Sequence, residues 1–119
     1  HPHVENNRVG RMVLRQRERV LARNVAIIRD NVRALERLTG AKGPRAGCVA
    51  FVELDGLDAN GGVTALCDAL FEEKGILLMP SSVFGAGDRH VRFGLGRAAF
   101  ARTLEEFVAW RGARATRPP

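Results

Sequence analysis

The hydrophobic positions of residues 10–38 recur with the spacing of one long helix. Its apolar stripe is formed by Leu14, Leu21, Ile28 and Leu35 at intervals of seven, with Val25 and Val32 between them. No proline or glycine interrupts the chain from Arg11 to Thr39, and Gly40 then provides a helix stop. At a rise of about 1.5 Å per residue the helix is about 42 Å long, which exceeds the width of a small domain. We expect it to lead into another part of a polypeptide or to pair with a partner. A coiled coil is the alternative, although Glu18 occupies one position of its seam.

Shorter elements follow the long helix. The apolar and β-rich runs predict three strands, and two amphipathic stretches predict helices; in chain order these are 48–54 (strand), 63–74 (helix), 76–79 (strand), 90–95 (strand) and 100–111 (helix). Glycine-rich and serine-rich loops separate them, among them the eight residues 81–88. This order predicts an α+β fold with two layers, in which the helices pack on one face of a small three-stranded sheet.

The last predicted strand carries an arginine in its middle. Alternation places Val91, Phe93 and Leu95 on one face and His90, Arg92, Gly94 and Gly96 on the other. An arginine that only kept a sheet face in water would not need an empty neighbour. The bare Gly94 beside Arg92 therefore indicates that this face receives a ligand.

Composition adds few constraints. The chain has 119 residues and a net charge of +6, carried by 17 arginines and only two lysines. This excess of arginine is compatible with nucleic-acid binding. A GC-rich genome is the stronger explanation, since it supplies the same excess and the basic residues are spread along the chain. No apolar run reaches the length of a membrane span. Cys48 and Cys67 both lie in apolar stretches, which predicts two buried free thiols. Because the chain begins without methionine, we interpret it as a segment of a longer polypeptide or as a processed product.

Several motifs occur in a familiar order. The strand GCVAFVELDG, the helix end EEKGILLMP, the loop PSSVFG, the strand HVRFGLG and the helix FARTLEEFVAW together resemble the C-terminal small domain of class I/II aminotransferases. These are pyridoxal-phosphate (PLP)-dependent enzymes of fold type I, in the aspartate aminotransferase superfamily. The resemblance covers a small domain at 10–112. The polar residues 1–9 before it are expected to form an N-terminal arm, and residues 113–119 after it a frayed tail. The resemblance implies that the long helix crosses from the large domain into the small one.

The resemblance assigns a role to Arg92. In the family a loop of Pro-Gly-x-x-Phe-Gly precedes a strand whose arginine binds the substrate α-carboxylate, and these positions correspond to Pro80–Gly85 and Arg92. Ser81 stands where glycine is usual. Phe84 and Ser82 are further candidates for substrate contact. Without the resemblance, an exposed arginine paired with Asp88 or with solvent is the simpler interpretation.

The catalytic lysine of the family has no counterpart in this chain. Lys42 lies in a turn and Lys74 at a helix end, and neither sits in the family's Ser-x-x-Lys context. The resemblance therefore implies that PLP binds to a large domain of the parent enzyme, that the segment contains no catalytic or metal-binding residue, and that alone it is inactive. It also implies amino-acid and 2-oxo-acid substrates and a cytoplasmic homodimer. A stand-alone α+β module that binds an anionic ligand or nucleic acid is the alternative.

Overall fold

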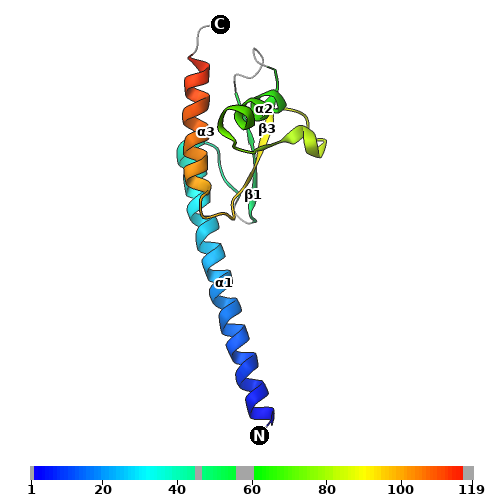
Figure 1. Cartoon of the computed structure of the whole chain (residues 1–119), viewed down its shortest axis with the longest axis vertical. Helices are drawn as coiled ribbons and strands as arrows, with labels where there is room; N and C mark the ends of the chain where they lie inside the picture. Colours follow the sequence, from blue (N-terminus) through cyan, green and yellow to red (C-terminus); the bar gives the residue numbers. More distant parts are fainter. Residues whose placement is uncertain (1, 45–46, 56–60, 117–119) are drawn as a thin grey trace.

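The structure of the chain, a computed structural model, describes residues 2–44, 47–55 and 61–116, with side chains in the first helix described from Asn7 onward. The elements are, in order, α1 (Pro2–Thr39), β1 (Val49–Glu53), α2 (Val63–Lys74), β2 (Met79–Pro80), the 3-10 turn η1 (Ser81–Phe84), β3 (His90–Gly94) and α3 (Phe100–Ala115). Figure 1 shows the long α1 running beyond a small body made of the other elements. The predicted α+β class is confirmed.

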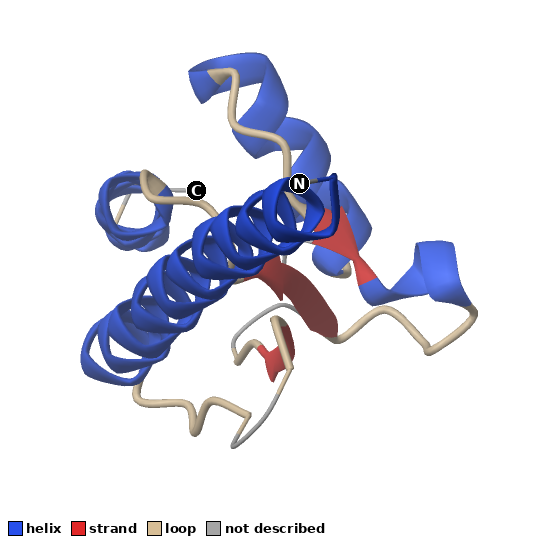
Figure 2. Ribbon diagram, turned by 90° about the horizontal axis from the view of Figure 1, so that it is seen from below, coloured by secondary structure: helices blue, strands red, loops and turns tan. Residues whose placement is uncertain are grey.

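The sheet has the order β1-β3-β2, and both pairings are antiparallel. One face is buried: Ala50 and Val52 of β1 lie with Val91 and Phe93 of β3 in the hydrophobic core, together with Leu54 and Leu95, which directly follow these strands. Figures 1 and 2 show α3 alongside the C-terminal part of α1, where the two helices pack together. On the opposite face Phe51, Glu53 and Gly94 are exposed, as the strand alternation predicts, and the 3-10 turn η1 borders this face through Phe84.

Helices α2 and α3 bury residues of the apolar stripes that the sequence predicts for them. Val63, Leu66 and Leu70 of α2 are buried, and so are Phe100, Leu104, Phe107 and Trp110 of α3. Phe93 meets Phe100 edge to face, with ring centroids 6.0 Å apart. Gly75 ends α2 in a left-handed conformation with φ 67°, which explains the glycine at this position.

Several boundaries differ from the sequence prediction. The first helix begins at Pro2, so residues 2–9, expected to form a polar arm, are helical. Proline suits the first turn of a helix, and extending a formed helix costs little. The last helix continues to Ala115 rather than ending at 111, so the helix takes in the start of the predicted tail; residues 117–119 lie outside the described part. Strand β2, predicted at 76–79, is shorter than predicted and includes Pro80. Proline is tolerated here because β2 is an edge strand of the sheet.

The N-terminal half of α1 has no partner within the described residues. The apolar side chains of this half are each more than half exposed, namely Val9, Met12, Val13, Leu14, Val20, Leu21 and Val25. Burial starts only near Ile28, and Asn31, Ala34 and Leu35 are the first fully buried positions. The molecule is therefore elongated, with dimensions of 76 × 27 × 27 Å. The described helices include none with the length and apolar character that crossing a membrane requires.

Candidate functional site

Arg92 occupies the centre of the open sheet face. It lies in the central strand β3, opposite Phe51 of β1 and Met79 of β2. Its neighbours Val91 and Phe93 are buried, whereas Arg92 is half-buried and Gly94 exposed. The predicted division of this strand into a core face and an open face is confirmed.

An aromatic pair fixes the position of the arginine. The Arg92 guanidinium carbon lies 5.4 Å from the ring centroid of Phe84, a cation–π contact. Phe84 in turn meets Phe51 edge to face, with centroids 5.9 Å apart. Both rings remain about half exposed, at 49% each. Phe84 therefore contacts the arginine. Phe51, which supports the Phe84 ring, is a residue of this site that the sequence reasoning missed. Its place on the open face follows from strand alternation, but the partner opposite it depends on the register.

The Arg92 guanidinium has neither a hydrogen-bond acceptor nor a carboxylate partner among the described residues. Asp88, the partner considered from the sequence, accepts hydrogen bonds from the backbone N–H of Thr64 at 2.8 Å and from its hydroxyl at 2.6 Å. Glu53, on the same sheet face, pairs with Arg89 at 3.4 Å. Both nearby carboxylates are thus engaged elsewhere, and the guanidinium keeps its hydrogen-bonding capacity.

The loop that carries Phe84 is braced from within by Ser81. This buried residue donates from Oγ to the carbonyl of Gly87 at 2.8 Å and accepts the backbone N–H of His90 at 3.2 Å. Ser82 is hydrogen-bonded to the Thr64 hydroxyl at 2.7 Å, so it ties the loop to the start of α2. The serine at 81, where the resemblance leads one to expect glycine, stabilises the turn that presents Phe84.

A cavity of about 450 Å³ adjoins Arg92. Its apolar wall is formed by Leu77, Leu78, Met79, Phe93 and Phe100, and its remaining lining by Arg92, Gly94, Arg97, Ala99 and Thr103. A Cβ atom placed on Gly94 would meet no atom within 4 Å, so this glycine leaves open space beside the arginine. Neither Phe84 nor Ser82 lines the cavity. Arg97 does line it, although sequence reasoning did not select this residue, because it lies beyond the predicted strand 90–95.

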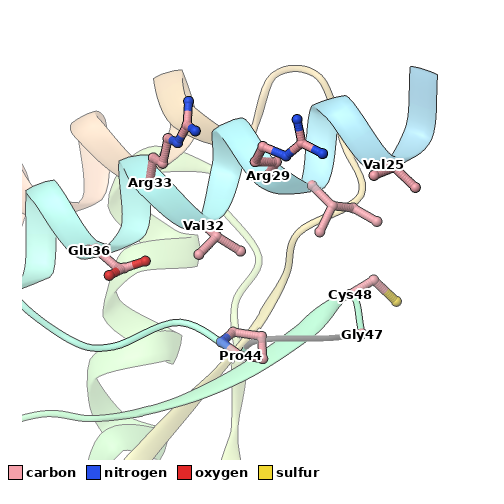
Figure 3. A pocket seen from close by; sticks show the side chains of 9 residues that line it. Val25, Arg29, Val32, Arg33, Glu36, Pro44, Gly47 and Cys48 are labelled. Atoms are coloured by element: carbon pink, nitrogen blue, oxygen red, sulfur yellow. The ribbon is translucent and has the colours of Figure 1, made fainter. Parts of the chain in front are cut away.

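A larger groove of about 690 Å³ lies between α1 and three residues after it, Pro44, Gly47 and Cys48. In Figure 3 Val25 and Val32 point toward Pro44 and Cys48, while Arg29 and Arg33 point away from them. None of the predicted site residues lines this groove.

The two cysteines differ in exposure. Cys48 is exposed, which corrects the prediction that both thiols are buried. It lies just before β1, where the groove separates α1 from the strand and leaves the thiol uncovered. Cys67 is buried as predicted, and this burial, together with the charges of Asp68 and Asp88, raises its pKa to about 11. The Cys67 thiol therefore stays protonated at neutral pH and is a poor nucleophile.

Comparisons with known proteins identify a related fold. No protein-family model matches the chain, and no curated protein does. A solved structure of a PLP-dependent aminotransferase from Streptococcus suis 89-1591 is similar, with a TM-score of 0.66 over 93% of this chain and 20% sequence identity. The match covers 30% of that chain, so the present chain spans less than a third of its length. At this identity the comparison establishes a shared fold.

The described residues do not fit PLP. A Schiff base needs a lysine amine in an enclosed site, whereas Lys42 and Lys74 are both exposed and neither lines the cavity beside Arg92. Within the described part, no group of three or more His, Cys, Asp or Glu side chains could hold a metal ion. What this part of the chain offers is a fixed cation beside an apolar cavity.

Proposed function

We propose that the chain is the small domain of a PLP-dependent aminotransferase, or of a related enzyme acting on amino acids, and that Arg92 binds the substrate α-carboxylate. The observation that carries the proposal is the Arg92 guanidinium on the open sheet face, which has no carboxylate partner among the described residues and lies next to the space left by Gly94. The fold shared with part of an aminotransferase supports it.

The chemistry of a guanidinium suits this role. It is always charged and binds a carboxylate through two parallel hydrogen bonds. The central strand holds the arginine backbone, and the Phe84 ring restricts its side chain, so little freedom is lost when the substrate binds. PLP, held by the remainder of the enzyme, would supply the electron sink for the reaction. The contribution of this chain is to orient the amino acid and, by closing over the active site, to exclude water.

The large domain of the parent enzyme is the proposed partner. The exposed apolar stripe of α1, which includes Leu14 and Leu21, provides a surface for it. Assembly of the parent as a cytoplasmic homodimer belongs to the same proposal.

Replacing Arg92 in the complete protein tests the role of the guanidinium. We expect Arg92→Lys to raise the KM for the amino acid by about 10- to 100-fold, since lysine cannot form the bidentate pair. Affinity for PLP, measured from the cofactor absorbance, should stay the same. Arg89→Lys is the matched control because Arg89 is exposed and precedes the same strand. Equal losses of amino-acid and cofactor binding, or no loss of either, would reject the proposal.

The coding sequence upstream of this segment provides a second test. The proposal requires a preceding domain that carries the Schiff-base lysine. A reading frame without one would favour the alternative, a stand-alone module that binds an anionic ligand or nucleic acid through Arg92 and the exposed arginines. Nucleic-acid binding would then show a steep loss of affinity with salt.

A further inference from the structure

A hydrogen-bond network joins the start of α2 to the loop before β3. Val63, the first residue of the helix, donates its backbone N–H to the carbonyl of Asp88 at 3.0 Å, and Thr64 donates its own to the Asp88 carboxylate at 2.8 Å. The N-cap residue, Gly62, makes no side-chain cap bond. Asp88 therefore caps α2 from a distant part of the sequence, and its negative charge lies at the positive end of the helix.

The residue at the N-cap is fitted to this carboxylate. A Cβ atom on Gly62 would clash with the carboxylate oxygen Oδ2 of Asp88. The φ of Gly62 is −85°, which any residue can adopt, so the backbone conformation does not require glycine here. The close approach of Asp88 to the helix end is the physical reason for the glycine.

The network continues from Asp88 into the loop through the Thr64 hydroxyl. This hydroxyl lies 2.6 Å from the Asp88 carboxylate and 2.7 Å from the Ser82 hydroxyl. A carboxylate oxygen only accepts, so the single hydroxyl proton of Thr64 is donated to Asp88. The Thr64 oxygen then accepts the proton of Ser82. Both hydrogen bonds depend on one hydroxyl group.

This hydroxyl fastens both ends of the loop that forms the arginine site. At one end, Ser82 belongs to η1, which also carries Phe84, and the Phe84 ring contacts the Arg92 guanidinium. At the other end, Asp88 lies just before β3, the strand that holds Arg92. The start of α2 therefore sets where the aromatic ring lies relative to the arginine.

We propose that Thr64 is a positioning residue for substrate binding. Its hydroxyl fixes Ser82 and, through η1, the Phe84 ring against which the Arg92 guanidinium rests. Thr64 itself contacts no substrate and acts by limiting the freedom that the arginine loses when a carboxylate binds. This inference rests on the proposed function, in which Arg92 binds the α-carboxylate.

Thr64→Val in the complete, PLP-loaded protein tests the inference, because valine has the shape of threonine without the hydroxyl. We expect the KM for the amino acid to rise about 3- to 10-fold. The kcat should stay within about twofold, because the carboxylate is bound alike in the ground and transition states. Thr64→Ser, which keeps the hydroxyl, should restore the original KM.

Thr39→Val is the matched control. The Thr39 hydroxyl also makes two hydrogen bonds, donating to the Leu35 carbonyl at 2.6 Å and accepting from the Ala41 N–H at 3.2 Å, but it lies at the end of α1. This substitution removes the same group with the same number of bonds and should leave the KM unchanged. An equal rise of KM in both valine variants would overturn the inference, because a general loss of stability would explain it.

Ser82→Ala breaks the same network from the loop side, at an exposed residue and with the cap of α2 intact. It should raise the KM as much as Thr64→Val does, and the double substitution should raise it no further, since both remove one shared bond. In a Phe84→Leu background, Thr64→Val should have no additional effect on KM. Additive effects in either pair would overturn the inference.

The Arg92→Lys variant separates this inference from the proposed function. A higher KM in Arg92→Lys together with an unchanged KM in Thr64→Val overturns the inference and leaves the proposed function standing. An unchanged KM in Arg92→Lys overturns both, whatever Thr64→Val does.

Discussion

The absent side chain of Gly94 is as informative as the charged side chain of Arg92. Both lie on the open face of β3, and the glycine is paired with Val49 across the sheet. Glycine weakens a strand, by roughly 0.5–1 kcal/mol relative to alanine. Its backbone does not require glycine, since only Gly40, Gly47, Gly61, Gly75, Gly85 and Gly87 have positive φ among the described residues. Space beside Arg92 is the remaining physical reason for a glycine here.

Gly94→Val in the complete protein therefore separates stability from binding. The new side chain meets no atom at its Cβ and suits a strand, so the free energy of unfolding should stay the same or rise. The added methyl groups enter the cavity, and kcat/KM for the amino acid should fall by about 10- to 200-fold. Gly96→Val is the matched control: its Cβ also meets nothing within 4 Å, and it lies outside the cavity. Equal kinetics for the two variants would show that the space beside Arg92 receives no substrate.

At the scale of elements, hydrophobic periodicity predicted the helix and strand faces that local sequence determines. The bounds of α2 and the inward faces of α2, α3 and β3 agree with the sequence prediction. The placement of Arg92 on the open face followed from alternation alone. Contacts between distant segments were beyond reach: the Phe51–Phe84 pair depends on register and loop geometry, and Arg97 lines the cavity only through the turn after β3. The exposure of Cys48 likewise depends on the groove between α1 and the start of β1, which no local run of residues could predict.

Asn31 is the clearest of these distant contacts, and it joins α1 to the segment that follows β3. Its side-chain amide donates to the carbonyls of both Leu95 and Arg97. Asn31→Ala removes both bonds in a buried site, and we expect the free energy of unfolding to fall by about 1–3 kcal/mol in urea titrations of this chain. Asn24→Ala, on the exposed part of the same helix, should be neutral or slightly stabilising. Similar effects of the two substitutions would mean that the Asn31 bonds do not hold α1 to this turn.

The whole molecule combines a packed body with a helix that extends beyond it (Figure 1). The body buries one face of a small sheet under three helices, while the first part of α1 keeps its apolar stripe in solvent. An apolar stripe of this length is typical of an interface. We propose that the remainder of the same polypeptide covers this stripe, because the fold is shared with 30% of a longer aminotransferase chain. The alternative is a coiled coil with the α1 helix of a second copy.

The double substitution Leu14→Glu and Leu21→Glu tests which partner covers the stripe. Both leucines are more than half exposed here, at 57% and 52%, so the unfolding midpoint of this chain should not change. In the complete protein the two carboxylates would be buried against the large domain, which should lower the free energy of unfolding by more than about 2 kcal/mol. Sedimentation of the chain alone, with and without the substitutions, provides the control for self-association. A dimer of this chain that the substitutions dissociate, together with an unaffected complete protein, would show that α1 pairs with another copy instead.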